Sequence, residues 1–252
     1  MVSGFWFLVS VFGFLSPFTL HLHSSDIHLG PCRVASIVQR NIFITGATGY
    51  IGSRLVPELV LRGHTVRALV RPGSEGKLPK GAVAVVGNAL DGSTFAKQVA
   101  PSDTFIQLVG VAHPSPSKEK EFRSIDLVSM RESVAAARAA GIEHFIYLSV
   151  AQPAPIMRAY VDVRAEGERL ARGAGFRVTF VRPWYVLGPG HRWPYIILPL
   201  YWLWMLSPKS RETARRLYPV KLKQVLRALA DAVDAPPEEV RIIEAPEMRE
   251  SG

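Results

Sequence analysis

Cysteine is almost absent from this chain of 252 residues, which contains Cys32 and no other cysteine. One thiol excludes both an intrachain disulfide and a zinc site built from several cysteines. A reducing compartment is therefore compatible with the sequence, and we expect no metal site.

Acidic residues are also few, since 21 Asp and Glu face 30 Lys and Arg and give a formal net charge of +9. The imbalance is concentrated in residues 209–227, "KSRETARRLYPVKLKQVLR", where Glu212 is the one acid. No RNA- or DNA-binding motif accompanies these basic residues, so we expect no nucleic-acid partner. A solvated basic face is our first interpretation, and a surface that faces a membrane is the second.

Charge is missing altogether from residues 1–25, "MVSGFWFLVSVFGFLSPFTLHLHSS". This apolar run is about long enough to span a bilayer, and Arg33 and Arg40 beyond it would keep the rest of the chain cytoplasmic. It lacks the basic segment that opens a secretory signal. A membrane anchor and a start codon assigned too early, with the domain beginning near Val34, both stay open. We therefore treat residues 1–40 as an extension and expect a cytoplasmic protein, with membrane association through residues 1–25 as one alternative.

From residue 41, segments typical of buried strands alternate with segments whose apolar residues have helical spacing. Strands are predicted for residues 41–45, 64–71, 82–88, 104–112, 144–150 and 177–183, and helices for the segment after residue 50, for 126–141 and for 160–173. Alternation of this kind predicts an α/β fold, a Rossmann-like doubly wound parallel sheet with helices on both faces. We assign residues 41–190 to this domain and residues 191–252 to a small C-terminal substrate or lid region packed on it.

The strongest local motif is "TGATGYIG", which joins the first predicted strand to the first helix. Gly46, Gly49 and Gly52 allow a sharp turn and a close approach of the backbone to a pyrophosphate. The N-terminus of the following helix offers N–H groups and a positive dipole end to the same phosphates. This placement predicts nucleotide binding.

The end of the second strand indicates which nucleotide is bound. Sites specific for NAD usually place an acid there for the ribose hydroxyls, whereas this strand ends in "ALVRPG" with Arg71. A guanidinium can hold a 2′-phosphate through two parallel hydrogen bonds. NADP(H) is therefore favoured over NAD(H), although a solvent-exposed arginine is the simpler alternative.

Tyr160 and Arg164 lie four residues apart in "AYVDVRAEGERL", so both project from one helix face. A fixed cation favours the phenolate and lowers the pKa of a neighbouring tyrosine, which suits a proton donor. The alternative is a half-exposed tyrosine that packs on an arginine stem.

Taken together, several segments resemble a known family. They are "FITGATGYIGSRLVPELVLRGHTVRALVR", "AGIEHFIYLS", the Tyr-x-x-x-Arg-Ala-Glu-Gly-Glu segment and "VRPWYVLGPG". In this order they resemble the atypical and extended short-chain dehydrogenase/reductases, and within these the NAD(P)H-binding, NmrA-like group that includes a nucleotide-binding accessory subunit of respiratory complex I. The likeness covers about residues 41–190 and is more specific for fold and cofactor than for reaction. The segment "YPVKLKQVLRALADAV" is similar to the late helix of the family.

The resemblance implies a catalytic set. Tyr160 matches the tyrosine that exchanges a proton with the substrate oxygen, and Ser149 the serine that steadies that oxygen. Arg164 stands where active members have a lysine, and this departure leaves turnover in doubt. Ser149 could instead cap a turn, and Asn88, expected near the adenine, could brace a loop. The full set expected to bind the cofactor is Gly46, Ala47, Thr48, Gly49, Tyr50, Ile51, Gly52, Arg71, Asn88, Ala89, Leu108, Val109, Gly110, Arg164 and Pro183.

Residues 193–206, "WPYIILPLYWLWML", form an uncharged aromatic run too short to span a bilayer. A buried helix that closes the sheet, an apolar substrate pocket and a surface for a membrane or a partner are the three interpretations. The leading functional hypothesis is an NADP(H)-dependent oxidoreductase or epimerase-like enzyme acting on the hydroxyl or carbonyl group of a small apolar molecule. The alternative is a redox sensor or accessory subunit that binds NADPH without turnover. The sequence leaves the oligomeric state open.

Overall fold

The computed structural model describes residues 38–190, 196, 198–208 and 210–250. Its centre is a seven-stranded, entirely parallel sheet with the strand order β3-β2-β1-β4-β5-β6-β9. The strands are β1 (Asn41–Thr45), β2 (Thr65–Val70), β3 (Ala82–Val86), β4 (Thr104–Gln107), β5 (His144–Leu148), β6 (Arg177–Arg182) and β9 (Val240–Glu244). Because the chain starts at β1 in the middle and winds outwards in both directions, the doubly wound prediction is confirmed.

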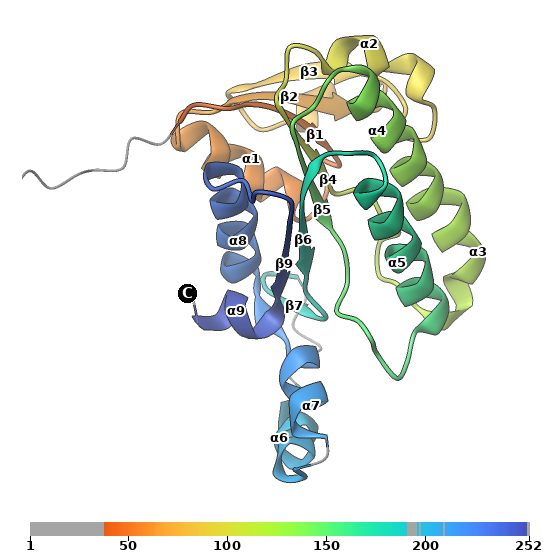
Figure 1. Ribbon diagram of the computed structural model, residues 1–252, viewed down its shortest axis with the longest axis vertical. Helices are drawn as coiled ribbons and strands as arrows, with labels where there is room; N and C mark the ends of the chain where they lie inside the picture. Colours follow the sequence, from red (N-terminus) through yellow and green to blue (C-terminus); the bar gives the residue numbers. More distant parts are fainter. Residues whose placement is uncertain (1–37, 191–195, 197, 209, 251–252) are drawn as a thin grey trace, which may run out of the picture. The chain divides into compact units, whose positions relative to one another are not determined.

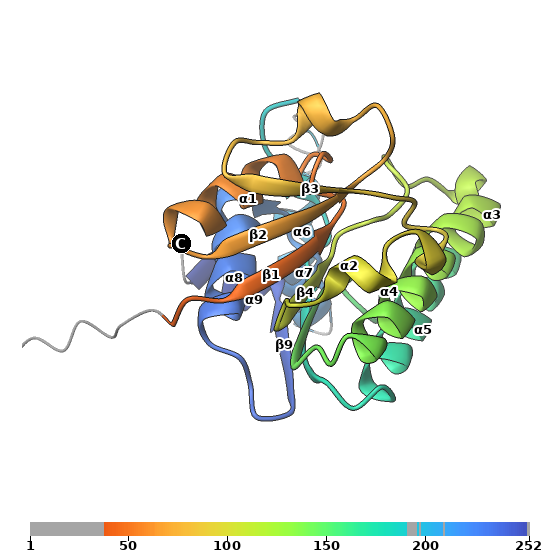
Figure 2. The ribbon, with the colours of Figure 1, turned by 90° about the horizontal axis from the view of Figure 1, so that it is seen from above.

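Helices cover both faces of the sheet (Figures 1 and 2). Helices α1 (Gly52–Leu61) and α8 (Leu222–Asp234) lie on one face, and α4 (Val128–Ala139) and α5 (Arg158–Arg172) lie on the other. Strand β1 shows how the sequence produces these two cores. Its Ile42 and Ile44 pack towards α1 and α8, whereas Phe43 between them packs into the opposite core, because successive side chains of a strand alternate between faces.

The remaining elements are short and lie mostly at the ends of the strands. They are η1 (Glu75–Lys77), η2 (Gly92–Thr94), α2 (Ala96–Val99), η3 (Pro116–Lys118), α3 (Glu119–Glu121), η4 (Phe122–Leu127), β7 (Val186–Leu187), α6 (Leu198–Leu206), α7 (Arg211–Leu217), β8 (Val220–Lys221) and α9 (Ala245–Glu250). Strands β7 and β8 pair with each other in a separate parallel ribbon.

In the main sheet, two strands differ clearly from the prediction. Strand β4 ends at Gln107 rather than near residue 112, because Leu108 and the residues after it leave the sheet and line a cavity. Strand β9 was not predicted, although its sequence VRIIE contains three β-branched apolar residues. It is an edge strand of five residues in which Ile243 alone is buried.

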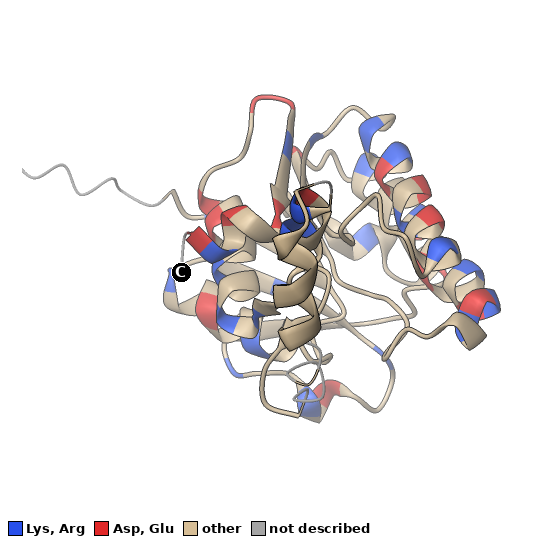
Figure 3. Cartoon of the chain, turned by 90° about the horizontal axis from the view of Figure 1, so that it is seen from below, with Lys and Arg blue, Asp and Glu red and all other residues tan. Residues whose placement is uncertain are grey.

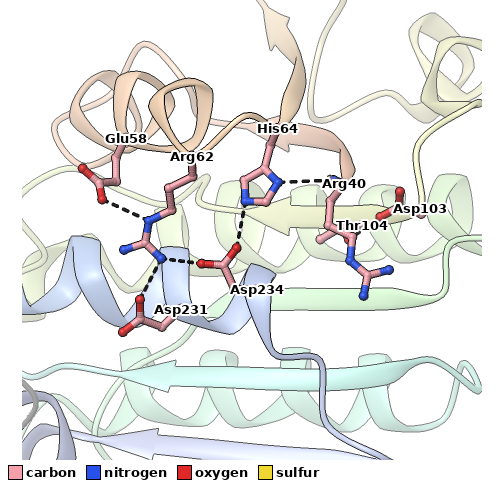
Figure 4. Close-up of polar contacts among 8 residues, drawn as sticks. All are labelled: Arg40, Glu58, Arg62, His64, Asp103, Thr104, Asp231 and Asp234. Atoms are coloured by element: carbon pink, nitrogen blue, oxygen red, sulfur yellow. Dashed lines mark hydrogen bonds and ion pairs between the residues drawn. The ribbon is translucent and has the colours of Figure 1, made fainter. Parts of the chain in front are cut away.

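The amino-terminal end of the sheet, opposite the cavity, is held by a cluster of charges that joins α1 to α8 (Figure 4). Arg62, which caps α1, lies 2.7 Å from Asp231 and 2.6 Å from Asp234 of α8. Asp234 also accepts a hydrogen bond from Nε2 of the buried His64, whose Nδ1 accepts the backbone N–H of Arg40. Since Nδ1 is the acceptor, Nε2 carries the ring proton. The cluster fixes the helix pair and lies away from the cavity.

No helix among the described residues is long and apolar enough to cross a membrane. The anchor expected in residues 1–25 lies outside the described part of the chain, as do residues 193–195 and 197 of the aromatic run. The division of the chain near residue 190 stays a prediction.

Candidate functional site

A cavity of about 630 Å³ lies at the carboxyl ends of β1, β4, β5 and β6. Four of the segments that line it each follow one of these strands: the glycine turn after β1, the loop after β4, the turn after β5 and the segment after β6. The start of α5 lines it as well. In doubly wound folds the ligand site lies at this edge of the sheet, where the strand order changes direction. Here the change of direction falls between β1 and β4.

The glycine turn has little free space, and this explains its composition. Gly46 has a φ of +73°, which only glycine adopts without strain, and a Cβ added there would lie 3.0 Å from the backbone carbon of Leu108. A Cβ added at Gly52 would lie 2.2 Å from the carbonyl oxygen of Gly46. The turn therefore folds tightly on itself and directs the N-terminus of α1 into the cavity, where N–H groups without intrahelical partners can bind phosphate oxygens.

Arg164 points back into the protein from the buried face of α5. Its Nη1 donates to the carbonyl oxygen of Leu148 at 2.8 Å, and its Nη2 lies 3.3 Å from a carboxylate oxygen of the buried Asp126. The guanidinium also lies so close to Gly110 that a Cβ there would be 2.1 Å from Nη2. The sequence predicted that Gly110 lies along the cofactor. In the structure, the missing side chain of Gly110 leaves space for the guanidinium of Arg164.

Asp126 couples this arginine to the cavity wall. One carboxylate oxygen binds Arg164 and the other accepts the backbone N–H of Val111 at 2.6 Å, in the loop after β4. Asp126 belongs to the π-helical turn η4, which Ser129 and Gln107 brace by hydrogen bonds. The position of Arg164 is therefore set by three separate segments.

Tyr160 lies one turn before Arg164 and lines the cavity beside it. The guanidinium carbon of Arg164 lies 5.1 Å from the centre of the Tyr160 ring, and the ring of Phe122 packs on the same tyrosine at 4.9 Å. Burial raises the pKa of Tyr160 above its usual 10, and the charge of Arg164 offsets only part of this rise. The sequence predicted a lower pKa for Tyr160. The charge of Arg164 does lower this pKa, but burial raises it by more.

Ser149 follows β5 directly and also lines the cavity. It is buried, and its hydroxyl has no hydrogen-bond partner among the residues that the structure describes. It therefore does not cap a turn, which was the alternative to a role at the site. A buried hydroxyl without a partner costs free energy, so a ligand in the cavity is the natural partner for it.

The cavity brings together eleven of the residues expected from the sequence. They are Gly46, Gly49, Tyr50, Ile51, Gly52, Leu108, Gly110, Ser149, Tyr160, Arg164 and Pro183. Ala47, Thr48, Arg71, Asn88, Ala89 and Val109 are not among its lining residues. Ala47 is fully buried and Arg71 is exposed. The side-chain oxygen of Asn88 accepts the N–H of Leu90 at 3.0 Å, so this side chain braces its own turn.

Sequence reasoning missed the apolar part of the lining and the groups that hold Arg164. The missed residues are Val111, Ala112, His113, Pro114, Ser115, Leu148, Val150, Met157, Trp184, Tyr185 and Val186 at the cavity and Asp126 and Tyr147 behind it. Many of these residues lie in loops that directly follow a strand of the parallel sheet, and this position would have indicated a place at the ligand site. His113 and Met157 have positive φ values, which for residues other than glycine are concentrated at functional sites.

Comparison with known proteins agrees with this geometry. A family model described as NAD(P)H-binding matches residues 46–193, more than half of the chain. A farnesyl-dihydroquinoline-oxide ketoreductase of Stigmatella aurantiaca is 27% identical over 58% of this chain and 50% of its own length. A chloroplastic divinyl chlorophyllide a 8-vinyl-reductase of Oryza sativa subsp. indica is 30% identical over 61% of this chain and 42% of its own. The chain thus spans about half the length, or less, of these curated relatives.

Solved structures show the same fold at lower identity. The WbmH enzyme of Bordetella bronchiseptica in complex with NAD⁺ has a TM-score of 0.61 and 19% identity, covering 82% of this chain and 76% of that one. A UDP-galactose 4-epimerase has a TM-score of 0.60 and 19% identity over 81% and 77% of the two chains. The family match agrees with the resemblance to the NmrA-like group of atypical short-chain dehydrogenase/reductases that the sequence indicated. It covers more than half of the chain and agrees with the fold and the glycine turn, so the chain belongs to the NAD(P)H-binding family.

Proposed function

We propose that this protein is an NADP(H)-dependent reductase that acts on the carbonyl group of a lipophilic small molecule. The observation that carries the proposal is one cavity in which Tyr160 and the unpartnered hydroxyl of Ser149 lie together with the glycine turn. A phenol can donate a proton and a hydroxyl a hydrogen bond, and both are needed where a carbonyl oxygen gains negative charge.

The residues around the cavity suit a nicotinamide cofactor and an apolar substrate. The turn Gly46–Gly52 and the start of α1 would hold the pyrophosphate, and Leu108 and Gly110 would lie along the cofactor. Trp184, Tyr185 and Met157 add an apolar wall for the substrate. The name of the ketoreductase relative contains a compound with a farnesyl group, which supports a lipophilic substrate for this protein.

The chemistry follows from these positions. A nicotinamide cofactor held by the glycine turn would supply the hydride that the carbonyl carbon gains. Tyr160 gives its phenolic proton to the carbonyl oxygen, which leaves an alcohol, and Ser149 donates a hydrogen bond to the same oxygen. Because burial keeps the pKa of Tyr160 raised, the phenol carries the proton that reduction requires at neutral pH.

The test is turnover with a panel of carbonyl compounds. Purified protein is first examined for bound nicotinamide cofactor and is then mixed with NADPH and either apolar ketones or short polar keto acids, while NADPH absorbance is followed. We expect oxidation of NADPH with the apolar ketones. Cofactor binding without turnover on any compound would contradict the reductase proposal.

The second candidate function is a sensor or accessory subunit that binds the cofactor without turnover. Arg164 favours it, since this guanidinium is held by Asp126 and Leu148 and is a poor substitute for the lysine that active members of the resembled family have at this position. Tight NADPH binding, no turnover and a change in the protein on NADPH binding would support this candidate.

Cofactor preference is a separate prediction. Arg71 is exposed directly after β2, the neighbour of β1 in the sheet, and so follows the strand beside the glycine turn. We expect NADPH to bind more tightly than NADH, and Arg71→Ala to weaken NADPH binding by about 10- to 100-fold while NADH binding stays the same, because charge-assisted hydrogen bonds to phosphate contribute roughly 1.5–3 kcal/mol. Titration of both cofactors by calorimetry measures this.

Lys77 provides the matched control, since it is another exposed cation in the same connection, in η1. Lys77→Ala should leave the preference unchanged. Equal affinities of the parent protein for the two cofactors would show that Arg71 does not bind a 2′-phosphate.

A further inference from the structure

Helix α6 presents large apolar side chains to solvent. Five such residues in and beside this helix are between 67% and 82% exposed: Ile196, Leu200, Trp202, Leu203 and Leu206. From Leu198 to Leu206 the sequence LPLYWLWML contains no charged residue, and Figure 3 shows α6 without charge while α4 and α5 carry both signs. A helix that is apolar on all sides is normally buried. We therefore expect another molecule to bind the exposed apolar face of α6.

The helix is firmly joined to the rest of the domain. Its buried Tyr201 packs on Tyr218 with ring centres 5.7 Å apart and belongs to the same apolar cluster as Trp184. Trp184 lines the cofactor cavity. The exposed apolar face of α6 therefore lies near the wall of the site that Trp184 forms.

Positive charge adjoins this face. Arg211 of α7 is exposed, and its Nε donates to the carbonyl oxygen of Met205 in the last turn of α6 at 3.1 Å. Arg215, one turn further along α7, is also exposed. Aromatic and leucine side chains beside arginines form the combination that binds the interface of an anionic membrane.

The length of α6 and the charges of α7 beside it indicate which kind of molecule binds the exposed face. The nine residues of α6 extend about 14 Å, less than half of the roughly 30 Å of a hydrocarbon core, so α6 can lie in an interface but cannot span it. A second copy docked through the same face would bring the arginines of two α7 helices together, and like charges oppose such a contact.

We propose that α6 and Arg211 dock the protein on the surface of a membrane that contains anionic lipid, with Trp202 and its leucine neighbours inserted at the headgroup level. Docking there places the Trp184 side of the cavity next to the bilayer. This extends the proposed function, because a lipophilic substrate could enter the cavity from the membrane. The docking itself requires no turnover, so the two proposals can fail separately.

Co-sedimentation of the full chain with vesicles tests this proposal. Vesicles of phosphatidylcholine with phosphatidylglycerol should bind the protein, and vesicles of phosphatidylcholine alone should bind it more weakly. Trp202→Glu should weaken binding by more than about tenfold, and Arg211→Ala by about fivefold on the anionic vesicles only. Leu61→Glu is the matched control, because Leu61 of α1 is 84% exposed and lies on another part of the surface.

A second measurement identifies the inserted segment even if another part of the chain also binds lipid. Tryptophan fluorescence of the parent protein should be quenched by lipids with brominated acyl chains, and Trp202→Phe should remove a clear share of that quenching. Unchanged quenching after Trp202→Phe would overturn the proposal. A parent dimer that Trp202→Glu converts to a monomer, without any vesicle binding, would assign the face to a second copy instead.

Discussion

Tyr160→Phe is expected to lower the kcat/KM of carbonyl reduction by about 10²–10⁴-fold, the usual contribution of a positioned proton donor. The substitution removes one oxygen atom and keeps the ring, which packs on Phe122 and lies beside Arg164. NADPH affinity should therefore change by less than about twofold. Steady-state kinetics and a cofactor titration of the same preparation measure the two effects.

Tyr218→Phe is the matched control, since Tyr218 packs on Tyr201 and on Arg249 and is not among the residues that line the cavity. It should leave kcat/KM unchanged. Full activity of Tyr160→Phe would show that this helix face serves packing alone.

The pH dependence of the reaction follows from the same tyrosine. In the proposed reaction, reduction needs the protonated phenol of Tyr160, and burial raises the pKa of this group above 10. The rate of reduction should therefore stay level through neutral pH and fall only in strongly alkaline solution, while oxidation of the alcohol, which needs the phenolate, should rise with pH.

Gly52→Ala is expected to have the second large effect. The added Cβ would lie 2.2 Å from the carbonyl oxygen of Gly46 and 2.7 Å from the Cα of Ala47, so the turn itself must move. Overpacking costs roughly 1–3 kcal/mol even where side chains can yield, and here the obstacle is backbone. We expect a lower Tm and a loss of cofactor affinity of at least about tenfold.

Gly76→Ala is the control, because a Cβ there meets no atom within 4 Å and the residue has no positive φ. It should retain the Tm and the cofactor affinity of the parent protein. A Gly52→Ala protein that melts and binds NADPH like the parent would mean that the turn tolerates a side chain and that its geometry does not set the phosphate site.

Within the candidate site, the residues that sequence reasoning found share a local signal. The glycines lie at a strand–helix junction, and Tyr160 and Arg164 have helical spacing, so neighbours in the sequence sufficed to single them out. Asp126 gave no such signal. It is 38 residues from Arg164 in the sequence, and their contact exists only because η4 and α5 pack together.

The sequence by itself determined the parallel α/β fold, the glycine turn and the position of the helix that carries Tyr160 and Arg164. The spacing of apolar residues, the residues of the turn and the spacing of the motifs are local properties of a chain. The tertiary structure decided three further matters. It raised the pKa of Tyr160, because burial outweighs the charge of Arg164. It directed Arg164 towards Asp126 and Leu148, and it left α6 exposed beside Arg211. Each of these depends on which surfaces meet in the folded chain, and sequence spacing does not contain that information.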